Sequence, residues 1–192
     1  MNWLENMNKA NERFKSQVDE NLLPVNREPC PYAVVTCMDP RINLEAIGIG
    51  PFAPTGQIDS HVRVIRTIGG LHDIRSLIIG IHLAGFKEIA VIMHTDCGCS
   101  LALQKIDTII NNMISNLTGT QFESVKSIVG EPFEENLVDW LGAFEDPYAA
   151  VVNEVENIKK SVFIPKSLIV HGIVYDLATG GMDIVINGYE KG

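Results

Sequence analysis

The sequence has no cluster of basic residues. Its 15 lysines and arginines are outnumbered by 24 aspartates and glutamates, which gives a formal net charge of −9 at pH 7. Surfaces that bind nucleic acids or anionic membranes normally carry concentrated positive charge. We therefore predict that the chain binds neither a nucleic acid nor a membrane.

The sequence also has no apolar run long enough to span a membrane and no visible export signal. Its longest apolar stretches are broken by His72, Arg75 and His82, whereas a membrane-spanning helix needs about 20 predominantly apolar residues. The first residues, Met1 to Asn6, contain neither the basic nor the apolar segment of a signal peptide. These absences predict a cytoplasmic protein.

Cysteine is scarce, with four residues in a chain of 192. This number is too small for the disulfide framework of a secreted domain, and the missing export signal indicates a reducing compartment. Metal binding is therefore the better use for these thiols. The phosphate-loop pattern GxxxxGK[S/T] is absent as well, so we do not interpret the glycine pair Gly69-Gly70 as a phosphate-binding loop.

Strand and helix patterns alternate along the chain. Short apolar, β-branched runs predict strands at 32–37, 62–66, 89–93, 167–175 and 183–187. Apolar residues at helical spacing predict helices at 3–20, 71–81 and 106–117. A looser segment at 118–132 then leads to more helix, of which 148–160 is the clearest part. This alternation predicts an α/β fold with a mostly parallel sheet flanked by helices, and the turn at 179–181 predicts an antiparallel hairpin at its C-terminal edge.

The length and composition fit one soluble globular domain, 1–192. The chain is 46% hydrophobic and 20% charged, as in ordinary soluble proteins, and it is long enough to bury a sheet between helices. We expect an N-terminal helical arm over about residues 1–22, followed by a proline-containing connector at 22–31. A short helical turn at 44–47 then precedes a glycine- and proline-rich loop at 48–56.

Two short motifs carry the most chemistry. Cys37 and Asp39, with Arg41 two residues later, follow the first predicted strand, and His94 and Cys97 follow the third. Two thiolates and an imidazole are favourable ligands for Zn²⁺. In open α/β sheets, ligands bind outside the carboxyl ends of the strands, so these side chains converge if the two strands are neighbours. Three ligands beside a charged pair favour a catalytic site over a structural one, which usually has four protein ligands.

These motifs resemble the β-class carbonic anhydrases, which carry C-x-D-x-R after one strand and H-x-x-C after another. The resemblance extends to the arginine-containing strand before Gly69-Gly70 and to the closing segment 170–180. It implies a Rossmann-like sheet, one Zn²⁺ per subunit held by Cys37, His94 and Cys97, and a homodimer or a larger even-numbered homo-oligomer. It also implies an enzyme, a zinc lyase of the carbonate dehydratase type, that reversibly hydrates carbon dioxide to bicarbonate and a proton.

The resemblance gives Asp39 and Arg41 catalytic roles. Zinc lowers the pKa of a bound water to around 7, and Asp39 could orient that water by accepting its hydrogen bond. It could instead bind the metal as a fourth ligand and close the site, as in some members of the family. Arg41 would decide between these states, because a bidentate guanidinium–carboxylate pair holds Asp39 away from the zinc.

The sequence departs from the usual family pattern beside the site. Arg66-Thr67-Ile68-Gly69 stands where the family commonly has Arg-Asn-Ala-Gly, and Met93 stands where a glycine often precedes the histidine. Ile68 is bulkier than alanine, and we expect it near the cavity. These changes keep open a hydrolase of carbonyl sulfide or carbon disulfide on the same scaffold. A second alternative is a zinc scaffold or bicarbonate-sensing protein closed permanently by Asp39, although the intact Arg41 argues against it.

Each candidate residue also has an ordinary structural interpretation. Cys37 could be an inert buried thiol, His94 a hydrogen-bonded core histidine, and Asp39 with Arg41 a plain salt bridge around a turn. The presence of Cys37, His94 and Cys97 together favours the metal site. We interpret the remaining candidates as structural: Cys30 as a structural thiol, Cys99 as a small residue in the first turn of a helix, Asp96 as a helix cap, and His61, His72, His82 and His171 as surface or packing residues. One of these four histidines could instead shuttle protons, and the sequence does not choose among them.

Overall fold

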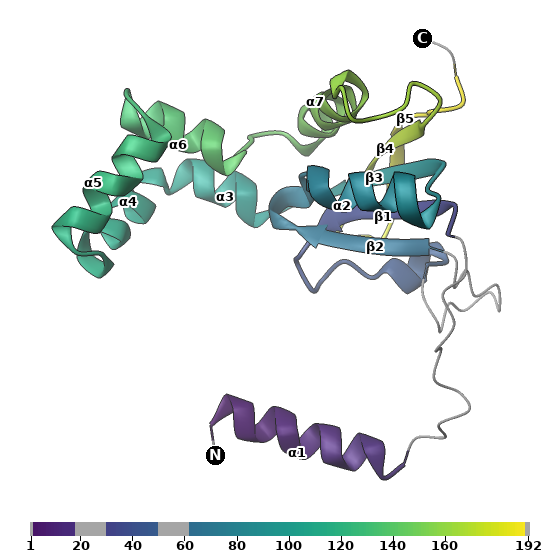
Figure 1. The fold of residues 1–192 in the computed structure, drawn as a ribbon, viewed down its shortest axis with the longest axis horizontal. Helices are drawn as coiled ribbons and strands as arrows, with labels where there is room; N and C mark the ends of the chain where they lie inside the picture. Colours follow the sequence, from purple (N-terminus) through teal and green to yellow (C-terminus); the bar gives the residue numbers. More distant parts are fainter. Residues whose placement is uncertain (1, 18–29, 50–61, 191–192) are drawn as a thin grey trace.

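The computed structural model describes residues 2–17, 30–49 and 62–190. Its centre is a five-stranded sheet in the order β2-β1-β3-β4-β5 (Figure 1). The strands are β1 (Tyr32–Cys37), β2 (Val62–Thr67), β3 (Glu88–His94), β4 (Ile169–Tyr175) and β5 (Met182–Ile186). Strands β2, β1, β3 and β4 are parallel, and β5 pairs antiparallel with β4. The predicted fold class, including the antiparallel C-terminal edge, is confirmed.

Some of the helices lie against this sheet, and others extend to one side of it (Figure 1). They are α1 (Trp3–Lys15), α2 (Ile74–Ile79), α3 (Gly98–Gln104), α4 (Ile106–Asn116), α5 (Gly119–Val129), α6 (Phe133–Leu141) and α7 (Pro147–Lys160). Short single turns complete the described elements, namely η2 (Leu44–Ile47), η3 (Ile68–Gly70) and η4 (Gly80–Ala84). In the described ranges, no helix is both long enough and apolar enough to cross a lipid bilayer.

Two predicted helices begin or end differently from expectation. The first helix ends at Lys15, with Ser16 as its C-cap, and not at residue 20. The second begins at Ile74, because the Asp73 carboxylate caps it by accepting from the Ser76 amide. Residues 18–29 and 50–61 lie outside the described residues. These ranges include the rest of the predicted arm, most of the connector, most of the glycine- and proline-rich loop, and His61.

The segment 118–132 is mostly helical, so its interpretation as a looser region is wrong. Helix α5 begins with a capping box, in which Thr118 accepts from the Gln121 amide and Gln121 accepts from the Thr118 amide. This reciprocal pair satisfies two N–H groups at the helix start, which offsets the weak apolar periodicity of the segment. The helix ends at Val129, where Gly130 has a φ of 87°.

One face of the sheet packs against α2 and α7. Val35, Val91 and Val170 point from three adjacent strands into this layer and are fully buried. Leu77 of α2 and Val155 of α7 meet them from the helices. Full burial of side chains of this size stabilises the fold by about 1.5–3 kcal/mol each. This layer fixes β1, β3 and β4 side by side, and it thereby fixes where their carboxyl ends lie.

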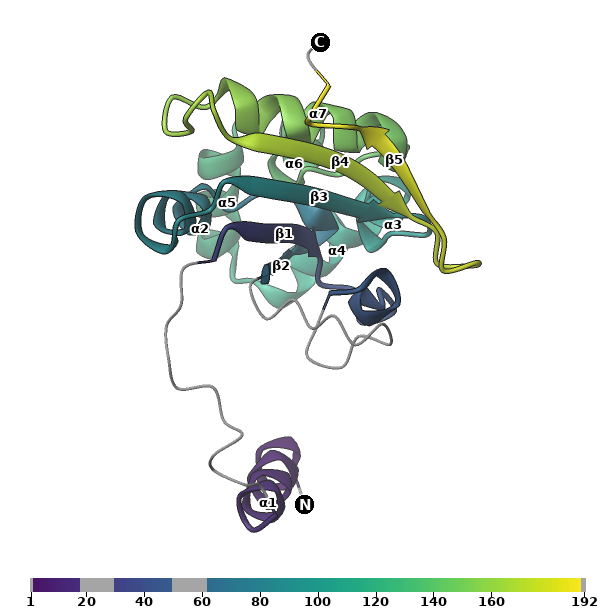
Figure 2. The ribbon, with the colours of Figure 1, turned by 90° about the vertical axis from the view of Figure 1, so that its right-hand side faces the viewer.

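The other face carries a smaller apolar cluster near those carboxyl ends. Val34 and Ile92 contribute to it from the sheet, and Ile42 and Leu44 cover them from the segment after β1. Figure 2 shows this segment beside the ends of β1 and β3. The candidate metal ligands Cys37 and Cys97 belong to the same cluster, so they are buried among apolar side chains.

The loop before α2 is held to α7 by a buried acid. Glu154 is 4% exposed, and it accepts hydrogen bonds from the backbone amide of His72 and from His72 Nδ1, the latter at 2.7 Å. The hydrogen bond to Glu154 raises the pKa of His72 above the ordinary value of 6.5. Because the folded pKa is raised, this pair contributes stability below about pH 6.5 and loses it as pH rises through the folded pKa.

We expect Glu154→Gln to lower the free energy of unfolding by about 1.5–3 kcal/mol at pH 6 and by less at pH 8.5, because the charged hydrogen bond matters most when His72 is protonated. Urea unfolding between pH 5.5 and 8.5 measures this. Glu156→Gln is the matched control, since Glu156 pairs with Lys160 on the exposed side of the same helix. Equal pH slopes for wild type and Glu154→Gln would contradict the prediction.

Candidate metal centre and active site

The three predicted ligands meet at the carboxyl ends of two neighbouring strands. Strands β1 and β3 pair in parallel, with Thr36 opposite Ile92, so Cys37 and His94 end adjacent strands. Cys97 follows as the N-cap of α3. All three side chains are buried, and their ligand atoms lie within 4.8 Å of one another. The expected adjacency of the first and third strands is therefore confirmed.

The geometry of this group fits a zinc ion. The Sγ atoms of Cys37 and Cys97 are 4.0 Å apart, and two sulfurs bound to one tetrahedral zinc at about 2.3 Å lie about 3.8 Å apart. His94 Nδ1 lies 2.8 Å from the Thr95 carbonyl oxygen. In the described part of the chain, His94 Nε2 is the one buried side-chain nitrogen or oxygen with no hydrogen-bond partner. A metal ion would satisfy this nitrogen while Nδ1 donates to the carbonyl.

The two thiols hold their protons tightly when no metal is present. The hydrogen bond with Cys97, followed by burial, raises the pKa of Cys37 to about 12. The hydrogen bond with Cys37 lowers the pKa of Cys97, but the contact with Cys99 and burial outweigh it and raise that pKa overall. A metal binds the thiolate form, so metal binding here must release these protons.

Asp39 and Arg41 form the bidentate pair that the sequence predicted. Arg41 Nε donates to Asp39 Oδ1 at 3.0 Å, and Nη2 donates to Oδ2 at 2.7 Å. The Arg41 backbone amide also donates to Oδ1, at 2.9 Å, which closes a turn around Pro40. These donors lower the pKa of Asp39 to about 2. Asp39 is therefore ionised at neutral pH, where it can only accept hydrogen bonds.

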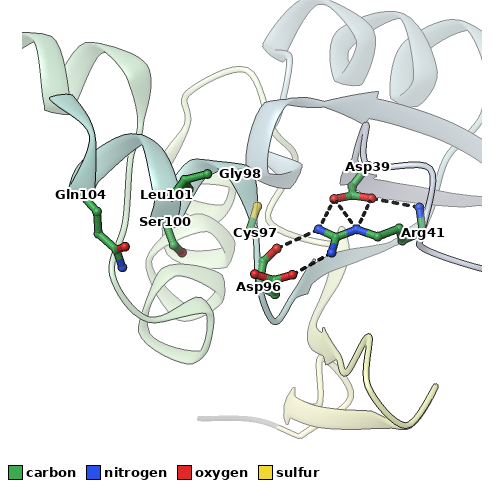
Figure 3. A pocket seen from close by; sticks show the side chains of 8 residues that line it. All are labelled: Asp39, Arg41, Asp96, Cys97, Gly98, Ser100, Leu101 and Gln104. Atoms are coloured by element: carbon green, nitrogen blue, oxygen red, sulfur yellow. Dashed lines mark hydrogen bonds and ion pairs between the residues drawn. The ribbon is translucent and has the colours of Figure 1, made fainter. Parts of the chain in front are cut away.

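The opposite edge of the same guanidinium contacts Asp96 (Figure 3). Arg41 Nη1 donates to Asp96 Oδ2 at 2.7 Å, and Nη2 donates to the Asp96 carbonyl oxygen at 2.9 Å. The interpretation of Asp96 as a helix cap is wrong, because Cys97 caps α3 through its sulfur. The position of Asp96 between two candidate ligands placed it beside the site, but it did not indicate Arg41 as its partner.

Sequence reasoning also missed the part that Arg66 plays in the site. It lies on β2, and its guanidinium donates to three backbone carbonyls of the segment after β1. The acceptors are those of Cys37 at 2.9 Å, Asp39 at 3.3 Å and Ile42 at 3.4 Å. Arg66 therefore holds the backbone that carries Asp39 and Arg41. The arginine-containing strand was part of the family resemblance, but nothing in its spacing indicated these acceptors.

The glycine pair packs closely against residues around the candidate ligand group. Gly69 and Gly70 have φ angles of 63° and 82°, which favour glycine. A Cβ on Gly69 would lie 2.8 Å from Cys99 Sγ, and one on Gly70 would lie 3.2 Å from the Ile92 carbonyl oxygen. Cys99 is 1% exposed and lies in the first turn of α3, as predicted for a small packing residue. Its sulfur is not part of the candidate ligand group in the described residues.

A cavity of about 360 Å³ opens beside this group (Figure 3). Its lining residues are Asp39, Arg41, Asp96, Cys97, Gly98, Ser100, Leu101 and Gln104. One wall is therefore polar and carries the charged pair, and the other is the first part of α3. Ile68, which we expected near the cavity, is not one of these lining residues. Met93 is fully buried in the apolar layer on the other side of the sheet.

Comparisons with known proteins point to one family. No protein-family model matches the chain. A putative carbonic anhydrase of Bacillus subtilis, YtiB, is 27% identical over 100% of both chains. A carbon disulfide hydrolase of Acidianus is 29% identical over 76% of this chain and 72% of its own length. Among solved structures, a β-carbonic anhydrase of Trichomonas vaginalis is 28% identical, with a TM-score of 0.76, over 98% of this chain and 100% of its own.

These matches agree with the arrangement of the site. The chain is similar to these proteins over its whole length. It also has a buried Cys-His-Cys group at the carboxyl ends of neighbouring strands. Beta-carbonic anhydrase 1 of Mycobacterium tuberculosis adds a further match, 27% identical over 80% of each chain. In sequence and in fold the chain is therefore similar to β-class carbonic anhydrases, as its motifs predicted.

Proposed function

We propose that this protein is a zinc lyase that reversibly hydrates carbon dioxide to bicarbonate and a proton. The observation that carries the proposal is the buried Cys37-His94-Cys97 group, in which His94 Nε2 has no hydrogen-bond partner. One of its members, Cys97, lines the same cavity as the charged pair. A group of three protein ligands leaves one tetrahedral position for chemistry. The family relatives that are named carbonic anhydrases support the same reaction.

In this proposal Cys37, His94 and Cys97 hold one Zn²⁺ per subunit. A zinc ion held there supplies a nucleophile from water near neutral pH. The two thiolates offset the charge of the ion within an apolar cluster. The Thr95 carbonyl accepts from His94 Nδ1, which fixes the ring orientation and leaves Nε2 available as the ligand atom.

Asp39 and Arg41 orient the reacting groups. Asp39 stays ionised because Arg41 donates to both of its carboxylate oxygens. Asp39 would therefore accept a hydrogen bond from the nucleophile and orient it toward the carbon of carbon dioxide. Arg41 holds the carboxylate away from the metal, and its side chain is 51% exposed, so it can also meet the bicarbonate anion as this product leaves.

The second candidate substrate class is carbon disulfide or carbonyl sulfide. Carbon disulfide hydrolases are 27–29% identical to this chain, as close as the carbonic anhydrases. These linear molecules need the same nucleophile, and they differ from carbon dioxide in size and polarity. The cavity is bordered by Leu101 on its apolar side, which accepts a small apolar molecule of either kind.

Stopped-flow hydration of carbon dioxide, compared with sulfide release from carbon disulfide and carbonyl sulfide, tests the choice directly. We expect hydration with kcat/KM in the range of about 10⁴–10⁸ M⁻¹ s⁻¹ that enzymes typically reach, together with about one zinc per chain. Sulfide release without hydration would move the assignment to the second candidate. Zinc-loaded protein inactive toward all three substrates up to about pH 9 would favour the closed scaffold instead.

We also propose that the chain forms one domain, 1–192, and assembles as a homodimer or a larger even-numbered homo-oligomer. In the part of the chain that the structure describes, nothing buries any residue of α1, and Figures 1 and 2 show this helix apart from the sheet. Its apolar side chains Trp3, Leu4 and Phe14 are 78%, 69% and 54% exposed, which favours a partner surface. Light scattering tests this, and a monomer at micromolar concentration would contradict it.

The cytoplasm is the proposed location. The four cysteines, all within the described residues, form no disulfide. Thiols that must bind zinc stay reduced in this compartment. Fractionation of cells that produce the tagged protein tests the location, and recovery from an exported fraction would contradict it.

A further inference from the structure

Arg41 is shared between two carboxylates, which contact opposite edges of its guanidinium. One edge of its guanidinium, Nε and Nη2, donates to Asp39. The other edge, Nη1 with Nη2, donates to the side chain and the backbone carbonyl of Asp96. All three guanidinium nitrogens are therefore engaged, and the side chain connects the segment after β1 to the segment after β3 (Figure 3).

The backbone of Asp96 is unusual. With a φ of 53°, it is the one non-glycine residue with positive φ in the ranges that the structure describes. Glycine fits this left-handed conformation most easily, and aspartate adopts it at some cost. The Asp96 side chain is 81% exposed, and exposed ion pairs contribute little to folding stability. Neither packing nor stability therefore explains why a carboxylate stands at this position.

The backbone beneath the pair is already fixed. Arg66 donates to the carbonyls of Cys37, Asp39 and Ile42, so the segment after β1 cannot move freely. The freedom that remains lies in the side-chain torsions of Asp39 and Arg41. Because Arg41 is half exposed, its guanidinium would turn toward solvent unless a second acceptor held its outer edge.

We propose that Asp96 is a positioning residue, which holds Arg41 on Asp39 and so keeps Asp39 away from the metal. This inference rests on the metal site and the Asp39–Arg41 pair of the proposed function. Without the Asp96 carboxylate, Arg41 leaves Asp39 more often. The Asp39 carboxylate is then free to take the fourth metal position, where it competes with water and with external anions.

Two substitutions separate the carboxylate from the backbone. Asp96→Gly keeps the left-handed conformation and the carbonyl that accepts from Nη2, but it removes the side chain. Asp96→Asn also tolerates this conformation and keeps a neutral oxygen that can accept from Nη1. The effects should therefore be ordered, with Asp96→Gly stronger than Asp96→Asn. A stability difference between the variants would not produce this order at the metal.

The experiment is a titration of cobalt-loaded protein with azide, followed by visible absorption. We expect azide to bind Asp96→Gly about two- to fivefold more weakly than wild type, with Asp96→Asn in between, as fits the loss of one exposed charged contact. Arg75→Gln is the matched control, since Arg75 pairs with Asp73 away from the cavity lining, and it should bind azide as wild type does.

Equal azide affinity in wild type and Asp96→Gly would overturn the inference. Tighter binding by Asp96→Gly would overturn it too, because Asp96 would then be drawing Arg41 away from Asp39. Failure of the proposed function looks different: the zinc-loaded wild type would hydrate no carbon dioxide, while the order of azide affinities among the cobalt-loaded proteins would remain. A wild type that takes up no cobalt would contradict the metal site and the inference together.

Discussion

Cys37→Ala loses its zinc and its carbon dioxide hydration together. Cys37 supplies one of three buried ligand atoms, and its sulfur lies 4.0 Å from that of Cys97. With this thiolate gone, two protein ligands remain, which is too few for a stable zinc site. We expect kcat/KM to fall by more than about 100-fold, the upper range for loss of a residue that only supports a ligand. Zinc content by mass spectrometry and stopped-flow hydration measure the two effects.

The neighbouring thiol provides a matched control. Cys99 is as deeply buried as Cys37, but its sulfur lies outside the ligand group and donates to the Gly142 carbonyl. Cys99→Ala should therefore keep about one zinc per chain and most of the activity. Retention of zinc by Cys37→Ala with unchanged hydration would contradict the assignment of Cys37 as a metal ligand. Loss of zinc from Cys99→Ala would instead make Cys99 a ligand.

The strands were predictable because burial leaves a strong local pattern. Strand β1 is buried at five of its six positions, so it is a continuous apolar run in the sequence. Strand β2 lies at the edge of the sheet and is only partly buried, yet its β-branched residues still gave its position to within one residue. The helix α5 was missed because its start depends on a reciprocal pair of side-chain hydrogen bonds, and not on apolar spacing.

The metal ligands could be predicted from the sequence, whereas the contact between Arg41 and Asp96 could not. Cys37, His94 and Cys97 are identified by residue type and by their place after strands, and both can be read locally. The contact between Arg41 and Asp96 joins residues 55 positions apart. It depends on the pairing of β1 with β3 and on a positive φ at Asp96. Neither the pairing register nor a single backbone torsion is written in the local sequence.

Arg41→Ala should keep its zinc and lose about 100-fold or more of kcat/KM at pH 7. Arg41 gives Asp39 three hydrogen-bond donors, Nε, Nη2 and the backbone amide, and alanine keeps only the last. The pKa of Asp39 then rises from about 2 toward the ordinary 3.8, so the carboxylate stays ionised at pH 7. A free carboxylate beside the metal group takes the fourth position and closes the site, and a small misplacement of a reacting group already costs about 100-fold.

A double substitution shows whether Arg41 acts through Asp39. Asp39→Asn removes both the closing ligand and the orienting acceptor, so it should lower the activity by itself. Adding Arg41→Ala to it should then change little, because the residue that Arg41 restrains is already gone. Losses that simply multiply in the double variant would contradict this coupling. A site closed permanently by Asp39 predicts yet another result: Arg41→Ala alone would change nothing, since there would be no open state for Arg41 to protect.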